Sequence, residues 1–332
     1  RNANGGAMKI LAADIGGTNA RFARVEIEGL SALEMSKPVV FPTWSDEIES
    51  FDHLLEHYSA NRPPGTPDVD GFDALSIAIA GAVSGQRATL PNISWDIDLG
   101  VSSAVRKGFL LNDFSAQAHG FMDPQVFDRL HCVRGGPGGG PGSIAIVGAG
   151  TGLGHAALKG HGGHRIVLTS EAGHATFAFH GPRERAIEDK LLARTGRRWL
   201  SSENVVSGSG AALLHEALTG KAVPPAEALR QNLPETETCR YFARFYARVC
   251  RNYCLAMFPV EALIISGGVA AKNPHLLESP SFLDEFDDGN AFRPLLERIP
   301  VYLNRDETIG IKGAAIHAWL QLGGGAGTTA SS

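Results

Sequence analysis

Cysteine is scarce in this chain, with 4 cysteines in 332 residues. That number is too small for the disulfide framework of a small secreted domain, so we expect a reducing compartment, the cytoplasm. Cys250 and Cys254 are four residues apart in an expected helix, where such a pair could be half of a metal site. Two small apolar residues in a buried stripe explain the same spacing better.

Long apolar runs and basic runs are also missing. No stretch approaches the roughly 18 apolar residues that cross a membrane, and the formal net charge is −5. We therefore expect neither a membrane nor nucleic acid among the partners. Residues 1–7 lack the charged and apolar regions of a signal peptide. Because Met8 resembles a start, we expect residues 1–7 to be a cloning remnant outside the fold.

Apolar residues and glycine are what the chain does contain. Hydrophobic residues make up 43% of it, which is enough to bury a core and excludes bulk disorder. Its length suggests two domains, at about 150 residues for each. The 40 glycines follow no collagen period and indicate many tight backbone turns.

Apolar strands that end in glycine or aspartate recur along the chain. We expect them at 8–14, 74–83, 109–113, 143–150 and 262–268. In open α/β sheets, ligands bind outside the carboxyl ends of the strands, where small residues let the backbone approach a ligand. The repeated pattern therefore predicts an α/β fold with a ligand site at the strand ends.

The strand at 8–14 passes through a glycine turn into a second strand at 20–28, whose apolar residues alternate with a period of two. This pattern predicts a β-hairpin, and a further strand is expected at 33–41. Helices are expected at 46–59, with Ser45 as N-cap, at 235–258 and at 308–321. The helix at 235–258 carries an apolar stripe that we assign to the core, made of Phe242, Phe245, Tyr246, Val249, Tyr253 and Met257.

The first glycine motif, DIGGTN at 14–19, lies in the turn of this hairpin. Gly16 and Gly17 leave backbone N–H groups that can point at an anion, and Thr18 adds a hydroxyl donor. Asp14 can face a hydrated Mg²⁺ that bridges nucleotide phosphates. An ordinary hairpin with a Gly-Gly turn is the alternative interpretation.

A second glycine motif, GAGTGLG at 148–154, lies between two expected strands. Its spacing fails the dinucleotide fingerprint G-x-G-x-x-G and lacks the Gly-Lys-Ser/Thr of a P-loop, which disfavours two common nucleotide folds. Two such turns, far apart in the sequence, suggest a clamp with one turn from each of two domains around one polyphosphate. A third segment, SGGVA at 266–270, opens a helix with small residues against which an adenine could lie.

This combination resembles the sugar kinases of the actin/hexokinase/Hsp70-type ATPase fold, and among them the bacterial-type glucokinases, from Met8 to about Leu320. The three glycine segments are similar to the two phosphate motifs and the adenosine motif of that family. Stretches at 111–114, 171–174 and 203–210 are similar to its sugar-binding segments. The resemblance implies a two-domain, ribonuclease H-like α/β fold with a cleft between the domains, which would span 8–112 plus 308–322 and 113–307.

The resemblance also implies roles for individual residues. Asp113 aligns with the catalytic aspartate, and Asn112 with its sugar-binding neighbour. Glu171 and His174 align with the pair that reads sugar hydroxyls, and Glu203 with an acid near the anomeric end of the sugar. ATP would be bound by Asp14, Gly16, Gly17, Thr18, Asn19, Gly150, Thr151, Gly152, Gly267 and Gly268, with Asp14 holding Mg²⁺ through water.

The chain departs from the family pattern at Ala172 and Ser209, where members often have Gly and Pro. Neither change removes a contacting side chain. The related repressor/kinase family usually has a Cys-rich zinc motif after its Glu-x-Gly-His, whereas ATFAFHGPRER follows here without cysteine. Without the resemblance, Asp113 and Glu203 would be read as helix caps, and His174 as a histidine of the core.

The implied activity is ATP-dependent phosphorylation of D-glucose at the 6-hydroxyl, in a protein that forms a homodimer. One rival is a kinase for mannose, fructose or N-acetylglucosamine, or one that uses polyphosphate as the donor. Other rivals are a non-catalytic sugar sensor and an ATP-hydrolysing chaperone or filament protein. The retained Asp113 favours catalysis over a sensor that only binds sugar. A chaperone or filament protein has no use for the Asn112/Asp113 and Glu171/His174 sets, which therefore favour the kinase.

Overall fold

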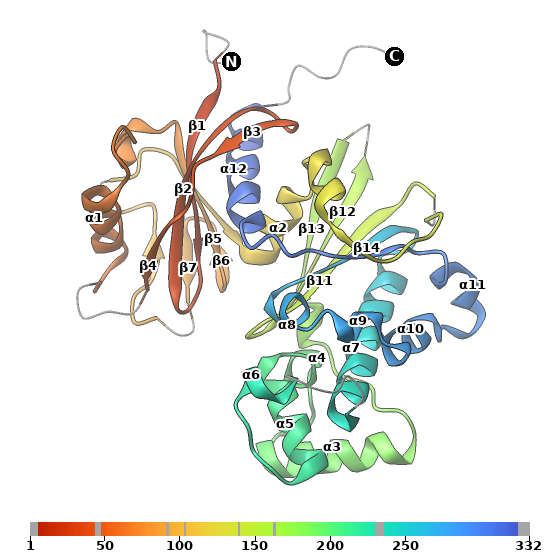
Figure 1. Cartoon of the computed structure of the whole chain (residues 1–332). Helices are drawn as coiled ribbons and strands as arrows, with labels where there is room; N and C mark the ends of the chain where they lie inside the picture. Colours follow the sequence, from red (N-terminus) through yellow and green to blue (C-terminus); the bar gives the residue numbers. More distant parts are fainter. Residues whose placement is uncertain are drawn as a thin grey trace. The chain divides into compact units, whose positions relative to one another are not determined.

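A computed structural model describes residues 6–43, 48–90, 93–102, 104–138, 140–161, 164–229 and 236–324. The chain divides into two compact units (Figure 1): the first is Arg1–Asp128 with Asp306–Ser332, and the second is Arg129–Arg305. Of residues 1–7, expected to be a cloning remnant, 1–5 lie outside the described residues.

The first unit is built on a mixed sheet with the strand order β3-β2-β1-β5-β9, in which β4 also pairs with β2. The central strands β1, β5 and β9 are parallel, and β2 runs antiparallel to β1. A separate small sheet contains β6, β7 and β8. The bounds are β1 Met8–Ile15, β2 Asn19–Gly29, β3 Ala32–Met35, β4 Val39–Pro42, β5 Ala74–Ile79, β6 Ala82–Ser84, β7 Arg87–Thr89, β8 Ile97–Asp98 and β9 Gly108–Asn112.

Helices cover both faces of this sheet, because its strands are apolar on both sides. In β1, Leu11 and Ala13 belong to the core cluster that includes helix α1 (Phe51–Asn61), whereas Ile10 and Ala12 belong to the cluster that includes α12 (Ile309–Gln321). This alternation follows from the period of two along a strand. Figure 1 shows α12, in dark blue, beside the red and orange strands of this unit.

Helix α2 (Asp113–Gly120) packs tightly against α12 within the first unit. A methyl group built on Gly313 would lie 1.7 Å from the carbonyl oxygen of Ala116, so only glycine permits this approach. The division of the chain therefore falls after Asp128, followed by Arg129, whereas the sequence predicts a boundary after Asn112. Packing of α2 on a helix from the far end of the chain is the physical reason for this correction.

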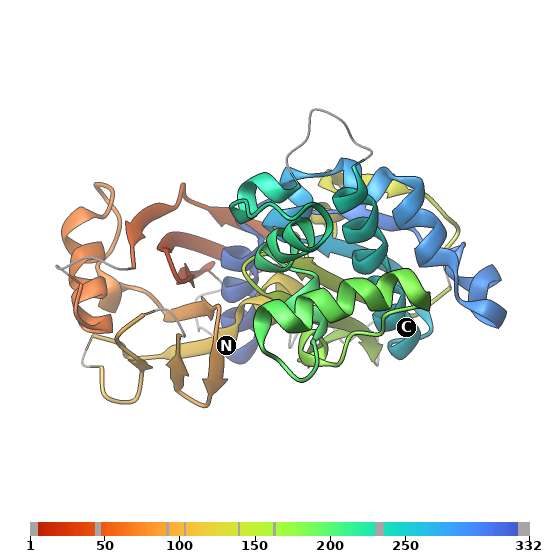
Figure 2. The ribbon, with the colours of Figure 1, turned by 90° about the horizontal axis from the view of Figure 1, so that it is seen from below.

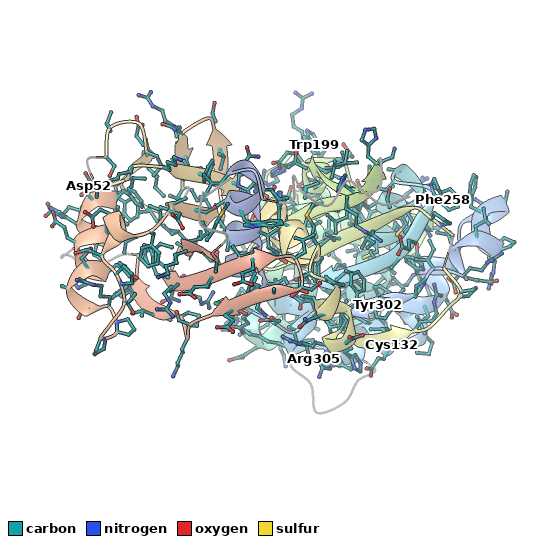
Figure 3. All side chains as sticks on the ribbon, turned by 90° about the horizontal axis from the view of Figure 1, so that it is seen from above. Asp52, Cys132, Trp199, Phe258, Tyr302 and Arg305 are labelled. Atoms are coloured by element: carbon teal, nitrogen blue, oxygen red, sulfur yellow. The ribbon has the colours of Figure 1, made fainter. Side chains whose placement is uncertain are left out.

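The second unit has a six-stranded sheet with the order β10-β15-β14-β11-β12-β13. Its strands are β10 His131–Arg134, β11 Ser143–Ala149, β12 Leu153–His161, β13 His164–Ser170, β14 Val260–Ser266 and β15 Val301–Leu303. Cys132 of β10 and Tyr302 of β15 are cross-strand partners and lie close together in Figure 3.

Helices form one core cluster with the sheet of the second unit. In Figure 2, the green and teal helices stand in front of the strands of this unit. The α-helices are α3 Gly181–Thr195, α4 Ser202–Val205, α5 Gly208–Thr219, α6 Pro225–Ala228, α7 Glu237–Ala256, α8 Gly268–Lys272, α9 His275–Glu278, α10 Pro280–Asp287 and α11 Arg293–Leu296.

Helix α7 confirms the helix expected at 235–258. Five residues of the expected stripe are buried in the core, and Met257, just after the helix, packs against it partly buried. Cys250 and Cys254 are buried in the same stripe. Their burial in the core cluster of the second unit supports the core interpretation of the two cysteines.

A buried ion network joins α7 to its neighbours. The guanidinium of Arg248, only 1% exposed, lies 2.6 Å from Glu184 Oε2 and 2.8 Å from Glu285 Oε1. It also donates to the carbonyl of Ala178 at 2.8 Å. Burial opposes ionisation of Glu285, but the hydrogen bond and charge of Arg248 and neighbouring arginines lower its pKa.

Three element boundaries differ from the sequence prediction. Helix α1 begins at Phe51 with Ser50 as N-cap, not at Ser45, which lies outside the described residues. The strand expected at 33–41 is interrupted at 36–38 and forms β3 and β4. The strand expected at 74–83 ends at Ile79, and its last residues turn into the small sheet as β6.

The described helices include none that combines the length and the apolar character needed to cross a membrane.

Candidate functional site

In the first unit, the carboxyl ends of the parallel strands meet at one edge of the sheet. Ile15 at the end of β1 pairs with Ile79 of β5, and Ile79 pairs with Asn112 of β9. The first glycine turn and Asp113 follow directly after these ends. Strand β9 is two strands away from β1, which corresponds to about 10 Å. The fold of this unit therefore brings the first phosphate motif and the Asn112–Asp113 pair to the same edge.

The first glycine turn joins β1 to β2 as the expected hairpin. The Gly16 amide donates to the carbonyl of Asn19 at 3.0 Å, and the Thr43 amide donates to the carbonyl of Thr18 at 3.1 Å. Thr18 and Asn19 are exposed at the tip, and Gly17 is half-buried. These bonds fix the backbone of the turn while its tip stays accessible to a ligand.

Asp14 lies one residue before the end of β1, in a poorly solvated position. Burial raises the pKa of its carboxyl to about 6, and the charge of Arg21 opposes this rise. The guanidinium of Arg21 lies 3.7 Å from Asp14 Oδ2 and 3.5 Å from a carboxylate oxygen of Glu307. Gly310, in the first turn of α12, is also close, since a methyl group there would lie 3.7 Å from Asp14 Oδ2. A carboxylate with so little solvation is stabilised by any cation that reaches it.

Asn112 is the N-cap of α2. Its Oδ1 accepts from the amides of Phe114 at 2.9 Å and Ser115 at 3.3 Å. Asp113 is the first residue of the helix, and its Oδ1 accepts from the Phe114 amide at 2.9 Å. The alternative in which Asp113 caps the helix is therefore wrong. Because the helix uses the acceptor of Asn112, its side-chain NH₂ is the group that this residue can offer as donor.

The second glycine turn, in the second unit, is held by a bond within its own hairpin and by contacts from α5 and α7. The Gly150 amide donates to the carbonyl of Gly152 at 2.8 Å, and the Gly208 amide, at the start of α5, donates to the carbonyl of Gly150 at 2.9 Å. The buried hydroxyl of Tyr246 accepts from the Ala149 amide at 3.0 Å. Thr151 is exposed at the tip.

Glu203 of α4 reaches this turn directly. Its Oε2 accepts from the amide of Leu153, the residue that follows Gly152, at 3.1 Å. Helix α5 has its own N-cap, since Ser207 Oγ accepts from the Gly210 amide at 3.1 Å. The alternative in which Glu203 caps that helix is therefore wrong.

Glu171 precedes a short 3₁₀ helix, Ala172–His174, which lies beside the same turn and ends with His174. His174 Nε2 lies 3.6 Å from Glu171 Oε2, and the two side chains are 63% and 82% exposed. His174 is therefore not a histidine of the core. Gly173 packs on the backbone of Leu153, because a methyl group there would lie 2.1 Å from the Leu153 carbonyl oxygen.

The third glycine segment meets the second glycine turn from β14. Gly267 has a φ of +91°, which favours glycine, and a methyl group on it would lie 2.6 Å from the carbonyl oxygen of Ala149. Helix α8 begins at Gly268. The second unit thus gathers Gly150–Gly152, Gly267 and the three expected sugar-binding side chains around one turn.

Tyr246 is the contact at this turn that the sequence does not reveal. Its position in the apolar stripe of α7 predicts core packing, which is correct for the ring. Nothing in the spacing indicates that its hydroxyl meets the Ala149 amide, because the two residues are 97 positions apart.

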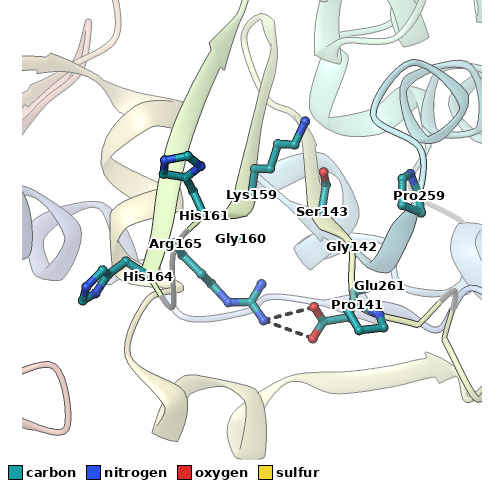
Figure 4. A pocket seen from close by; sticks show the side chains of 10 residues that line it. All are labelled: Pro141, Gly142, Ser143, Lys159, Gly160, His161, His164, Arg165, Pro259 and Glu261. Atoms are coloured by element: carbon teal, nitrogen blue, oxygen red, sulfur yellow. Dashed lines mark hydrogen bonds and ion pairs between the residues drawn. The ribbon is translucent and has the colours of Figure 1, made fainter. Parts of the chain in front are cut away.

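A surface hollow of ≈ 510 Å³ lies at the other end of the same strands. It is lined at 141–143, 159–161 and 164–165 and by Pro259 and Glu261. Figure 4 shows the Arg165 guanidinium directed at the Glu261 carboxylate, with both oxygens at 3.1 Å. The candidate residues at Gly150–Leu153 lie at the opposite end of β11 and β12, so this hollow is separate from them.

Comparison with known proteins points to one family. The family model described as glucokinase matches residues 11–321. A glucokinase from Nostoc punctiforme is 31% identical over 93% of this chain and 98% of its own length, and one from Zymomonas mobilis is 31% identical over 93% and 97%. The crystal structure of a glucokinase from an Antarctic psychrotroph superposes with a TM-score of 0.74 at 26% identity, over 93% of this chain and 98% of that one.

These matches extend over both units and confirm the expected α/β fold of the actin-like ATPase type. The chain belongs to the glucokinase family and is an ATP-dependent hexose kinase.

Proposed function

We propose that the chain transfers the γ-phosphoryl group of ATP to the 6-hydroxyl of D-glucose, with Asp113 as general base. The observation that carries this proposal is the shared edge of β1, β5 and β9, which brings Asp113 and the first glycine turn together. The carboxylate of Asp113 takes the proton of the 6-hydroxyl as the bond from that oxygen to phosphorus forms. The bond from phosphorus to the β–γ bridging oxygen breaks, and ADP leaves.

The proposed sugar contacts divide between the two units. Asn112 and Asp113 belong to the first unit, and Glu171, His174 and Glu203 to the second. Carboxylates accept hydrogen bonds strongly, whereas the Asn112 side-chain NH₂ donates, so the set suits the hydroxyls of a hexose. An epimer that covers one of these groups without pairing it loses about 1–3 kcal/mol, which is the basis of selectivity.

The proposed nucleotide contacts are the three glycine segments. Backbone amides of Gly17, Asn19 and Gly152, with the hydroxyls of Thr18 and Thr151, would donate to the phosphates. The amides of Gly16 and Gly150 bond within their own turns, so these two glycines would contribute by letting the backbone approach the phosphates. Gly267 and Gly268 would let the adenosine lie against the backbone. Phosphoryl transfer needs mainly positioning and charge neutralisation, which such donors supply.

Asp14 is the residue proposed to hold Mg²⁺, through a water molecule. The fit is chemical: Mg²⁺ prefers one or two carboxylates together with phosphate oxygens, and the carboxylate of Asp14 lies at the end of β1, directly before the first glycine turn, with its side chain 22% exposed. When bound, the metal neutralises charge on the phosphates. The part of this chain is to keep Asp14 ionised and oriented at the end of β1.

The test of the base is Asp113→Asn, with Asp128→Asn as control, since Asp128 is exposed in the same unit. We expect kcat to fall by about 10²–10⁴, the usual share of a general base. The Kd for glucose should change little. The control should keep full turnover. Nearly intact turnover in Asp113→Asn would show that another group accepts the proton.

The sugar range is tested by ADP release with glucose, mannose, fructose and N-acetylglucosamine. Glucose should give the highest kcat/KM. A higher value for another hexose would replace glucose as the substrate of this site.

A cytoplasmic homodimer is also part of the proposal. Its support is the family resemblance and the state of Cys132, Cys239, Cys250 and Cys254, all free thiols. Light scattering after size exclusion should give twice the chain mass, and a monomer mass would reject the dimer.

A further inference from the structure

Both backbone polar groups of Leu153, its N–H and its carbonyl oxygen, are contacted by segments proposed to bind the sugar. Its N–H donates to Glu203 Oε2 at 3.1 Å. Its carbonyl oxygen lies against Gly173, between Glu171 and His174, at a spacing that leaves no room for a side chain. Leu153 itself follows Gly152, the last glycine of the turn proposed to bind phosphate. One backbone unit therefore joins the two proposed binding sets of the second unit.

Glu203 is placed to act on both sets at the same time. A carboxylate has two oxygens and can accept several hydrogen bonds. Oε2 holds the Leu153 amide, and Oε1 has no hydrogen-bond partner among the residues that the structure describes. Glu203 is half-buried, so part of its side chain is open to a ligand.

Backbone contacts also join α4, which carries Glu203, to the segment that follows the 3₁₀ helix. The Ser202 amide donates to the carbonyl of Ala175 at 2.8 Å, which fixes the residue before Glu203 to the segment after His174. Thr176 and Ser201 form an isolated β-bridge beside it. A shift of the sugar-reading segment therefore moves Glu203 as well.

We infer that Glu203 is a positioning residue that couples hexose binding to nucleotide binding through the Leu153 amide. This inference rests on the proposed function and deepens it. A sugar hydroxyl on Oε1 fixes the carboxylate, and the fixed carboxylate holds the Leu153 amide, so that Gly150–Gly152 stay in one conformation. By linkage, nucleotide bound at this turn raises the affinity for sugar by the same factor.

The test compares Glu203→Ala and Glu203→Gln with Glu227→Ala, which removes an exposed carboxylate of α6 in the same unit. Binding of ADP is measured by calorimetry without sugar. Glutamine keeps an oxygen that accepts from the Leu153 amide, so its Kd should stay within about twofold of the parent. Alanine loses a charge-assisted hydrogen bond and should weaken ADP binding roughly tenfold. Glu227→Ala should match the parent.

A second measurement reads the coupling itself. The Kd of glucose is measured with and without a non-hydrolysable ATP analogue, and the ratio should fall from about 5-fold or more in the parent to near 1 in Glu203→Ala. Gly152→Ala should reduce the ratio in the same way, because its methyl group would lie 2.6 Å from Glu203 Oε2 and displace that oxygen. Thermal melting of each variant identifies any loss of folding.

Two results would overturn the inference. One is ADP binding by Glu203→Ala that equals the parent, and the other is a glucose–nucleotide ratio that survives both substitutions. Failure of the proposed function looks different: the parent chain itself would then bind no glucose, while the ADP measurement without sugar would still report on the Leu153 contact.

Discussion

The two units place their candidate residues in different ways. In the first unit, Asp14 and Asn112–Asp113 stand at the ends of parallel strands, so the register of one sheet positions them. In the second unit, Glu203 and Tyr246 each hold the glycine turn by a side chain that bonds to a backbone amide. The first arrangement depends on the packing of the sheet. The second depends on contacts between loops and helices, so the two units should respond differently to substitution.

The largest difference is expected at the buried charges. In Arg248→Met the carboxylates of Glu184 and Glu285, 3% and 5% exposed, lose the guanidinium that bonds to both of them. Arg244 still contacts both carboxylates and Arg251 still contacts Glu285, but the buried guanidinium between the two acids is gone, and the free energy of unfolding should fall by about 3–5 kcal/mol. The counterpart in the first unit is Lys312→Met, which breaks the more exposed pair with Asp306 and should cost about 1 kcal/mol or less. Urea unfolding measures both, and equal losses would contradict the comparison.

Each unit has a glycine that packs directly against a backbone carbonyl. Substituting one of these glycines should lower stability, and substituting the other should lower glucose affinity. Gly313→Ala puts a methyl group 1.7 Å from the Ala116 carbonyl oxygen, between two packed helices of the first unit. The free energy of unfolding should fall by about 3 kcal/mol. Gly173→Ala has a similar clash, at 2.1 Å from the Leu153 carbonyl oxygen, but in a 3₁₀ helix of only three residues, beside the exposed side chains of Glu171 and His174. Its KM for glucose should rise at least about tenfold, or 1.4 kcal/mol, with little change in stability.

The controls for this pair are Gly29→Ala and Gly160→Ala, where a methyl group meets nothing within 4 Å. Thermal melting and steady-state kinetics on all four variants make the comparison. If Gly313→Ala melts like the parent, or if Gly173→Ala loses stability but not glucose affinity, the assignment of roles to the two approaches fails.

The elements of the fold that follow from hydrophobic periodicity could be predicted from the sequence. The β1–β2 hairpin and the stripe of α7 follow from alternation and from helical spacing. The start of α1 could not be predicted, because Ser45 and Ser50 are both good N-caps. In the structure Ser50 caps the helix and Phe51, Leu54 and Leu55 are buried. These three residues share one face whichever serine begins the helix, so their spacing does not decide the start.

The candidate site divides in the same way. Glycine turns, Asp14 and Asp113 stand out in the sequence because chemistry and spacing coincide there. The bond from Glu203 to the Leu153 amide and the packing of α2 on α12 join residues distant in the chain. Such contacts are set by tertiary packing, which leaves no local signal.

Acid should destabilise the second unit more than the first. Burial lowers the pKa of His155, in the second unit, and of His317, in the first, to about 4. Between pH 6.5 and 4 the unfolded chain binds these protons and the folded chain does not, so each ring costs up to about 1.4 kcal/mol per pH unit as the pH falls. The stability due to the neutral rings is full above pH 6.5.

Asp14 acts in the opposite direction in the first unit. Its pKa is raised to about 6 in the folded chain, so between pH 6 and 4 the folded state takes up a proton that the unfolded state does not, which offsets part of the loss at His317. Hydrogen exchange at pH 7, 6 and 5 should show α7 losing protection faster than α12. Asp14→Asn should remove the difference, and His155→Gln should flatten the loss in α7. Equal loss in the two helices of the parent chain would refute this account.

The smallest effects are expected at two serine helix caps, one in each unit. Ser50 Oγ caps α1 through the His53 amide at 3.1 Å, and Ser207 Oγ caps α5 through the Gly210 amide at 3.1 Å. Alanine at either position should cost about 1 kcal/mol of stability. Ser50→Ala should leave the KM for ATP unchanged, because α1 supports only the core of its unit. Ser207→Ala should raise that KM about two- to fivefold, up to about 1 kcal/mol, because the next residue, Gly208, donates from the first turn of α5 to the carbonyl of Gly150.

If both variants lose stability and neither changes the KM for ATP, the glycine turn of the second unit keeps its shape without α5. Its support would then have to be sought in Glu203 and Tyr246 alone.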